Sequence, residues 1–167
     1  IFKDNPQVRI FYKENGGKYT ALNYALERID SEFVGCLDAD SFVKSCALKK
    51  IVPKFSDPLV MAVTPSIQVF EPKTILQRVQ RIEYSWGILF RTVLASITGL
   101  YVTPGPFSIF RTQMLKDIGA YRHAHQTEDM ELALRMHKHG HKIANAQEAH
   151  VFTVAPSKLR GLYKQRV

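Results

Sequence analysis

The strongest constraint on the fold is an alternation of short apolar segments with longer segments of helical periodicity. Short apolar runs bounded by polar residues are typical of buried strands, whereas apolar residues spaced three and four apart indicate helices. This alternation predicts an α/β fold with a mainly parallel sheet between helices, in which ligands bind beyond the carboxyl ends of the strands. We expect strands at 8–12, 33–37, 60–70, 107–110 and 151–153, and helices at 19–29, 46–55, 74–97, shortly before Gly119, 128–139 and from 157 onward.

The composition is that of an ordinary globular domain, with 46% hydrophobic and 23% charged residues over 167 positions. The formal net charge of +8 favours an anionic partner. No nucleic-acid-binding motif accompanies the basic residues, so we expect a diphosphate ligand and a nearby membrane surface rather than nucleic acid. Cys36 and Cys46 lack the spacing of a metal finger, which indicates reduced thiols. No run of about 18 apolar residues is present that would span a bilayer.

Two aspartates follow the apolar run 33–37 in the segment "VGCLDADSF". Carboxylates one residue apart at the end of a strand are suited to a divalent cation, because hard cations take oxygen ligands. A solvated turn explains Asp38 and Asp40 equally well. A third interpretation is the D-x-D-x-[TV] motif of haloacid-dehalogenase-type phosphatases, in which the first aspartate attacks phosphorus. Phe42 departs from that pattern.

A glycine turn precedes the helix expected at 19–29, in the segment "ENGGKYTALNYAL". A phosphate-binding P-loop is excluded, because Tyr12 stands where that motif requires glycine. What remains is Lys18 at the start of a helix, and a helix N-terminus with an ammonium beside it binds anions well. A turn with a solvated lysine remains the alternative.

Acidic residues gather at the start of the helix expected at 128–139, in "HQTEDMELALRMHKHG". Thr127 can cap this helix, and Glu128, Asp129 and Glu131 suit its positive end, which is a sufficient structural explanation. The functional alternative is that one of these acids, held on a rigid helix start, serves as a general base.

Five segments in order carry a resemblance to a known family: "ENGGKYTALNYAL", "CLDADSF", "TPGPFSIFR", "QTEDMELALRMHKHGHKI" and "LRGLYKQRV". Together they resemble the family-two inverting glycosyltransferases, and most closely the membrane-embedded processive synthases of poly-N-acetylglucosamine, hyaluronan, chitin and cellulose. The resemblance covers essentially the whole chain. It implies a Rossmann-like glycosyltransferase A-type fold and transfer of N-acetylglucosamine or another hexose from a UDP-sugar to a β-linked polysaccharide.

The resemblance also implies which residues bind the donor. Asp38 and Asp40 resemble the pair that holds Mg²⁺ or Mn²⁺ against the nucleotide diphosphate, with Asp40 the firmer ligand. Lys18 resembles the lysine that contacts the nucleotide or its diphosphate. Gln165 and Arg166 resemble the opening of a Q-R-x-R-W motif whose cations contact the pyrophosphate.

For the reaction itself, Asp129 resembles the general base. Glu128 and the segment from Gly105 to Arg111 resemble the parts that flank the sugar and the acceptor. A metal-dependent single displacement with inversion at the anomeric carbon is the chemistry that this arrangement implies.

The family pattern extends beyond both ends of the 167 residues, so we expect 1–167 to be the central part of one catalytic domain. The expected membrane helices would then flank it and hold it on the cytoplasmic side of the cell membrane. Two further alternatives stay open: a non-processive transferase of the same family acting on a lipid carrier, and a transferase-like fold used only for binding.

Overall fold

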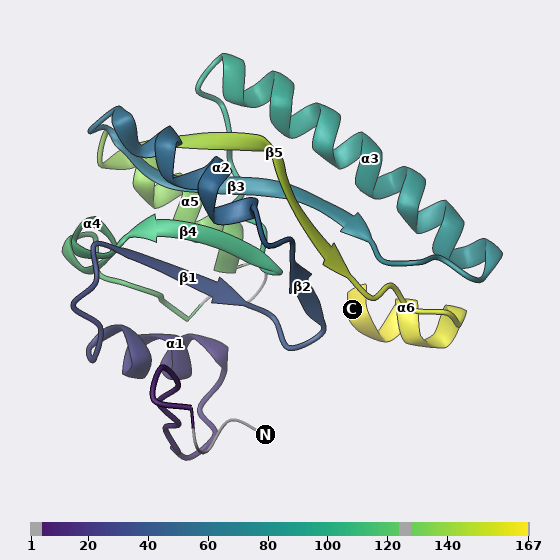
Figure 1. Ribbon diagram of the computed structural model, residues 1–167, viewed down its shortest axis with the longest axis horizontal. Coiled ribbons are helices and arrows are strands. Elements are labelled where there is room, and N and C mark those ends of the chain that lie inside the picture. Colours follow the sequence, from purple (N-terminus) through teal and green to yellow (C-terminus); the bar gives the residue numbers. More distant parts are fainter. Residues whose placement is uncertain (1–4, 124–127, 167) are drawn as a thin grey trace.

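The computed structural model describes residues 5–123 and 128–166, and a five-stranded sheet forms its centre (Figure 1). The strands lie in the order β1-β4-β3-β5-β2. Their bounds are Phe33–Leu37 for β1, Ser41–Val43 for β2, Val60–Val69 for β3, Phe107–Arg111 for β4 and Lys142–Thr153 for β5.

The strand directions correct the expectation of a mainly parallel sheet. β1, β3 and β5 run the same way, but β4 lies antiparallel between β1 and β3, and β2 pairs antiparallel with β5. Among the described strands, only β3 and β5 are parallel neighbours. The α/β class itself is confirmed. Strand direction was not predictable from apolar periodicity, because periodicity reports burial and not the path of the connecting chain.

The reversal of β4 places its first residues at the carboxyl end of β1. Phe107 pairs with Leu37, and the backbone N–H of Asp38 donates to the carbonyl of Pro106 at 3.2 Å. The segment 97–106 therefore leads the chain from the end of the long helix to the strand edge where ligands are expected.

The helices cover both faces and one end of the sheet (Figure 1). α3 begins with a capping box, in which Thr74 accepts from the backbone of Gln77 and the Gln77 side chain accepts from the backbone of Thr74. The helix expected at 46–55 is split into two pieces. The α-helix ends at Ile51 and the chain continues as a 3₁₀ helix, because Pro53 has no N–H to donate to an α-helical hydrogen bond. The bounds are Lys18–Leu26 for α1, Ala47–Ile51 for α2, Val52–Ser56 for the 3₁₀ helix η1, Ile75–Ser96 for α3, Thr112–Asp117 for α4, Glu128–Lys138 for α5 and Leu159–Arg166 for α6.

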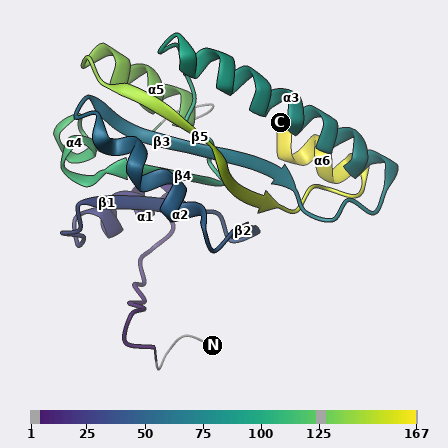
Figure 2. The same cartoon turned by 45° about the horizontal axis from the view of Figure 1, so that its top comes forward.

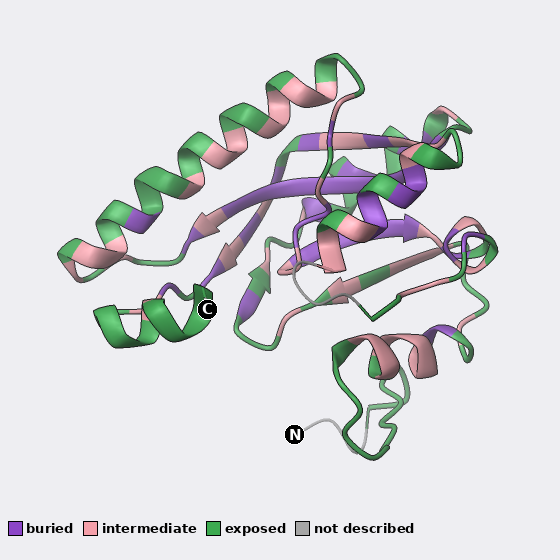
Figure 3. Cartoon of the chain, turned by 180° about the vertical axis from the view of Figure 1, so that it is seen from behind, coloured by how far each residue is buried: buried purple, intermediate pink, exposed green. Residues whose placement is uncertain are grey.

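Two hydrophobic clusters lie on opposite sides of the sheet, because successive strand side chains point to opposite faces. Phe110 of β4 joins the cluster formed with α4 and α5, and its neighbour Ile109 joins the cluster formed with α2 and η1. β3 is buried almost throughout and separates the two clusters (Figure 3). The sheet is thereby fixed rigidly beneath the edge that carries Asp38.

Two expectations about strands were wrong, and one strand was not predicted. Residues 8–12 form no strand, since no described strand pairs with them; Tyr12 is 82% exposed, and the segment lies apart from the sheet (Figure 2). β2 was missed because three residues are too few to show alternation. β5 begins at Lys142 rather than at 151. The expected cap Thr127 lies outside the described residues.

Much of α3 is exposed (Figure 3), and its exposed residues include a stripe of apolar ones at helical spacing. The stripe consists of Ile75, Val79, Ile82, Trp86, Leu89, Phe90, Val93 and Ile97. Within the described ranges, α3 included, no helix combines the length and the apolar content needed to cross a membrane.

Candidate active site

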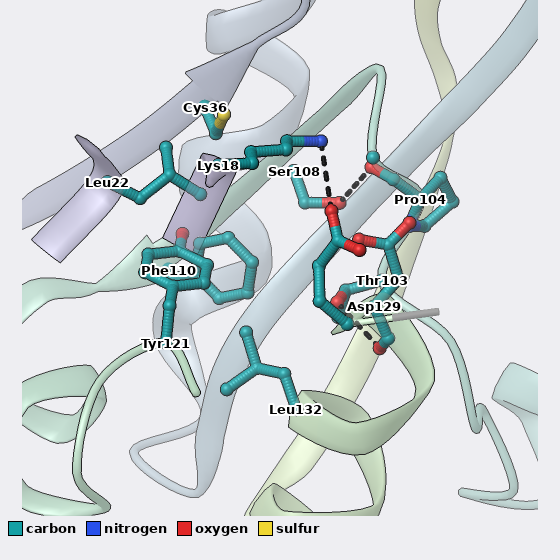
Figure 4. A pocket seen from close by; sticks show the side chains of 12 residues that line it. Lys18, Leu22, Cys36, Thr103, Pro104, Ser108, Phe110, Tyr121, Asp129 and Leu132 are labelled. Atoms are coloured by element: carbon teal, nitrogen blue, oxygen red, sulfur yellow. Dashed lines mark hydrogen bonds and ion pairs between the residues drawn. The ribbon is translucent and has the colours of Figure 1, made fainter. Parts of the chain in front are cut away.

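Four segments meet at the carboxyl end of β1 and bring charged side chains together (Figure 4). The start of α1 contributes Lys18, the end of β1 contributes Asp38, and the start of α5 contributes Glu128 and Asp129. The ammonium of Lys18 lies 3.3 Å from Oδ1 of Asp38 and 3.2 Å from Oε1 of Glu128. The fourth segment is the loop before β4, which contributes Gly105.

Gly105 contacts Asp129 so closely that a side chain does not fit. The backbone N–H of Gly105 donates to the Asp129 carboxylate. A β-carbon added at Gly105 would lie 2.9 Å from Oδ2 of Asp129 and 3.5 Å from the Lys18 nitrogen. Glycine is therefore required here by the close approach of backbone to carboxylate.

Asp129 is the most perturbed acid of the cluster. Burial raises its pKa from 3.8 to about 6, and the neighbouring Glu128 carboxylate adds to the increase. Lys18 and the Gly105 N–H act in the opposite direction. The backbone carbonyl of Asp129 accepts hydrogen bonds from the N–H of Thr103 at 3.4 Å and from the Thr103 hydroxyl at 3.2 Å. A carboxylate with a pKa of about 6 is ionised at neutral pH and still basic enough to take a proton.

The pocket beside these charges has a polar side and an apolar side (Figure 4). Its apolar side consists of Leu22, Cys36, Phe110, Tyr121 and Leu132. Burial raises the pKa of the Cys36 thiol and of the Tyr121 hydroxyl, so both are neutral at pH 7. An amphipathic pocket of this kind suits a ligand with hydroxyl groups on an apolar ring.

The two aspartates of the D-x-D segment lie in different surroundings. Asp38 is half-buried and pairs with Lys18, whereas Asp40 is exposed and accepts a hydrogen bond from the Ser41 hydroxyl at 3.2 Å. Over residues 5–123 and 128–166, no three His, Cys, Asp or Glu side chains gather into a metal site. Two carboxylates are nevertheless a donor set that fits Mg²⁺ or Mn²⁺, since Mg²⁺ typically takes its remaining ligands from water and substrate phosphates.

Gln165 and Arg166 lie on α6, outside the pocket that contains Lys18. Arg166 donates to both carboxylate oxygens of Glu83 on α3, at 2.7 and 2.6 Å. Burial raises the pKa of the adjacent Tyr84, which is also influenced by Glu83, Arg166 and Asp40. Arg166 and Asp40 thus both act on Tyr84, whereas Arg166 is not among the charges that act on Asp129.

The structure does not bring Arg111 to the site. Arg111 ends β4 at the end of the strand opposite Gly105, where it pairs with Phe33 of β1. Its guanidinium donates to the carbonyls of Val60 and Phe55 and lies 3.3 Å from the Glu32 carboxylate. These contacts hold Arg111 at the end of β4 that lies away from Asp129, outside the site.

Several pocket residues were not predicted to belong to the site, among them Cys36, Thr103 and Tyr121, whereas Ser108 falls within the predicted segment 105–111. Thr103 and Ser108 belong to the quoted "TPGPFSIFR" segment, which was the available signal. Tyr121 had no signal, because it lies in a loop between two short helices and reaches the pocket only through the fold.

Comparisons with known proteins bear on this geometry. Residues 3–167 match the family described as "Glycosyltransferase like family 2". The poly-beta-1,6-N-acetyl-D-glucosamine synthases of Staphylococcus aureus (strain COL) and Staphylococcus epidermidis are each 31% identical, over 100% and 99% of this chain. The chain spans 41% of the length of these relatives.

A solved structure shows the same fold. The mannosyltransferase PcManGT from Pyrobaculum calidifontis, in complex with GDP-Man and Mn²⁺, superposes with a TM-score of 0.68 at 20% identity. The match covers 90% of this chain and 40% of that one, and it establishes the glycosyltransferase A-type fold alone. With a family match over nearly its whole length and this site at the carboxyl end of β1, the chain belongs to glycosyltransferase family 2.

Proposed function

We propose that the protein carrying this chain transfers a hexose from a UDP-sugar to a growing β-linked polysaccharide, with inversion at the anomeric carbon. The observation that carries the proposal is Asp129 in its pocket: Gly105 contacts its carboxylate, Thr103 bonds to its backbone carbonyl, and burial raises the pKa of the carboxylate to about 6. The staphylococcal relatives are synthases of poly-beta-1,6-N-acetyl-D-glucosamine, which supports a polysaccharide product and N-acetylglucosamine as the sugar.

Asp129 acts as the general base in this proposal. It removes the proton from an acceptor hydroxyl as that oxygen bonds to the anomeric carbon, and the bond from that carbon to the diphosphate breaks on the opposite face. The proton ends on Asp129, and the electron pair of the broken bond leaves with the nucleoside diphosphate. The apolar side of the pocket, which includes Tyr121 and Leu132, limits the access of water to the base.

The charge balance of the site supports a requirement for a cation. In the described part of the chain, three pocket-edge carboxylates, Asp38, Glu128 and Asp129, surround the Lys18 ammonium. Such a cluster is net negative and repels a diphosphate. A Mg²⁺ or Mn²⁺ ion bound by Asp38 and Asp40 would offset the charge that develops on the leaving diphosphate.

Lys18 and Arg166 are the proposed fixed cations for the diphosphate. Lys18 is 43% exposed, so its ammonium is accessible to a ligand while it bridges Asp38 and Glu128. Arg166 and Asp40 both act on the pKa of Tyr84, and Gln165 lies beside Arg166 on α6, where both side chains are exposed. Glu128, next to the base, and Gly105 are proposed to line the acceptor side.

We extend the proposal to a membrane location, with 1–167 as part of a catalytic domain on the cytoplasmic side. The exposed apolar stripe of α3 is flanked by Arg78 and Arg81, and an apolar face beside basic residues is complementary to an anionic bilayer. We expect cosedimentation with phosphatidylglycerol vesicles to exceed that with phosphatidylcholine vesicles. Replacing Trp86 and Phe90 by glutamate should abolish the difference, whereas equal binding to both vesicle types would remove this part of the proposal.

Family membership removes the phosphatase alternative, and the transfer of a sugar to a lipid carrier remains the second candidate. The test is a screen of nucleotide sugars by release of nucleoside diphosphate, with and without added acceptor. Polymeric product from UDP-N-acetylglucosamine supports the synthase, and a single sugar on an isoprenoid phosphate selects the alternative. Binding of nucleotide sugar without release in any combination overturns the assignment as an enzyme.

A further inference from the structure

The segment between α4 and α5 adopts a strained backbone beside the pocket. Gly119 and Ala120 both have positive φ values, 90° and 53°. For alanine this left-handed conformation is unfavourable, because its β-carbon crowds the backbone, so neighbouring contacts must hold it in place. The next residue is Tyr121, whose ring lines the pocket and packs edge-on against Phe110 with centroids 6.3 Å apart.

α5 holds this segment from one side through a buried arginine. Arg135 is 7% exposed and donates to the carbonyls of Ile118 at 2.6 Å and Ala120 at 2.8 Å. Glu131, one turn earlier on α5, accepts two bonds from the same guanidinium at 2.8 and 2.9 Å. The segment is therefore fixed to the helix whose first turn carries Asp129.

α1 holds the segment from the other side through Asn23. The Asn23 amide donates to the carbonyl of Tyr121 at 2.7 Å and accepts from the N–H of Tyr121 at 2.9 Å. These two bonds satisfy the backbone donor and acceptor of one residue with a single side chain. They link two segments that are 98 positions apart in the chain.

The link adds to the contacts that place α1. Leu26, at the end of the helix, is its one fully buried residue, residues 19, 20 and 22–25 are half-buried, and the Tyr19 ring packs edge-on against His123 near the helix start. Lys18 lies five residues before Asn23, or about 7.5 Å along the helix axis. A rotation of α1 about Leu26 would therefore move the Lys18 ammonium away from Asp38 and Glu128.

We propose that Asn23 is a positioning residue for the transfer reaction. Through its two hydrogen bonds to the Tyr121 backbone, it fixes Tyr121 in the pocket wall and Lys18 relative to Asp129. This inference rests on the proposed function for its kinetic consequence, and on the contacts above for its structural one. The alternative is that the hydrogen bonds between Asn23 and Tyr121 add to the stability of the fold and leave the pocket unchanged.

The kinetic test compares Asn23→Ala with Asn145→Ala in the protein that carries this chain. Asn145 is a matched control, because it is also half-buried and its side chain donates to Thr92 on α3, away from the pocket. We expect Asn23→Ala to lower kcat by about tenfold to a hundredfold, the range for a misplaced catalytic group. Asn23→Gln retains the amide donor and acceptor and should recover part of the loss. Equal kcat values for both alanine variants would overturn the proposal.

A second readout does not depend on catalysis. Cys36 lines the pocket, so its alkylation by iodoacetamide, followed on the peptide that contains Cys36, reports access to the pocket. Cys36 should be alkylated at least several-fold faster in Asn23→Ala than in the parent at the same pH, and its alkylation rate in Asn145→Ala should match that of the parent. If the parent transfers no sugar, the proposed function fails, but the alkylation rate still tests whether the link between Asn23 and Tyr121 shapes the pocket. Equal alkylation rates in all three proteins would overturn the structural part of the inference.

Discussion

The backbone N–H of Gly105 donates to the Asp129 carboxylate, and a β-carbon at Gly105 would lie 2.9 Å from Oδ2 of that carboxylate. Gly105→Ala should displace the base and weaken its hydrogen bond. We expect kcat to fall by about tenfold to a hundredfold, with little change in donor affinity. Gly99→Ala, where the added carbon meets its neighbours at ordinary contact distances of 3.4 Å and more, is the control. A parental kcat in the Gly105→Ala variant would show that the position of the Asp129 carboxylate is not critical.

The raised pKa of Asp129 predicts a dependence of stability on pH. Its pKa in the folded chain is about 6 against an ordinary value of 3.8, so the ionised form is disfavoured by folding. The favourable contribution of the protonated form is therefore present below pH 4 and is lost as pH rises through 6. At 1.36 kcal/mol per pKa unit, the loss is at most about 3 kcal/mol.

Urea unfolding of the parent and of Asp129→Asn between pH 4 and pH 7.5 measures this effect. The free energy of unfolding of the variant should gain on that of the parent across the interval. Asp117→Asn, at an exposed carboxylate that accepts from Gln113, controls for charge removal alone. A constant difference between Asp129→Asn and the parent at all pH values would contradict the raised pKa.

Lys18 lowers the pKa of Asp129 through its positive charge. Lys18→Met should therefore move the acidic limb of the pH–rate profile to higher pH and also weaken donor binding. Lys13→Met, which removes an exposed lysine that bonds to Thr20, is the control. A limb that stays in place after Lys18→Met would show that another group titrates in the profile.

The metal proposal predicts that Asp40→Ala removes the chelator-sensitive part of nucleoside diphosphate binding, because the cation loses a ligand. Calorimetry with and without EDTA in Mn²⁺ measures it. Asp30→Ala, at another exposed aspartate, should retain the parental response. Chelator-insensitive binding in the parent would return the D-x-D segment to the solvated turn.

The sequence predicted the site best where function and local structure depend on the same short segment. The strand 33–37 was predicted with its observed bounds, and the segment after it carries Asp38 to the edge expected for ligands. Lys18 and Asp129 were placed at helix starts, and the structure brings these starts together although 111 positions separate them (129 − 18).

What was not predictable depended on the path of the chain between elements. β4 runs antiparallel to β1. This direction brings Gly105, just before β4, to Asp129 and places Arg111 at the other end of β4, beside Phe33. The motif in the sequence joined Gly105 and Arg111, but a five-residue strand holds them at opposite ends. Tyr121 and Asn23 show no local signal either, since their contact is created by tertiary packing.

The central claim is that Asp129 is the base of a sugar transfer, and turnover measured beside donor binding in Asp129→Asn tests it most directly. Asparagine keeps the size of the side chain but takes no proton, so kcat should fall by roughly 10²- to 10⁴-fold. The affinity for the nucleotide sugar should stay within a few-fold of the parent, because the base contacts the acceptor. Turnover within a few-fold of the parent, at equal donor affinity, would contradict the role of Asp129.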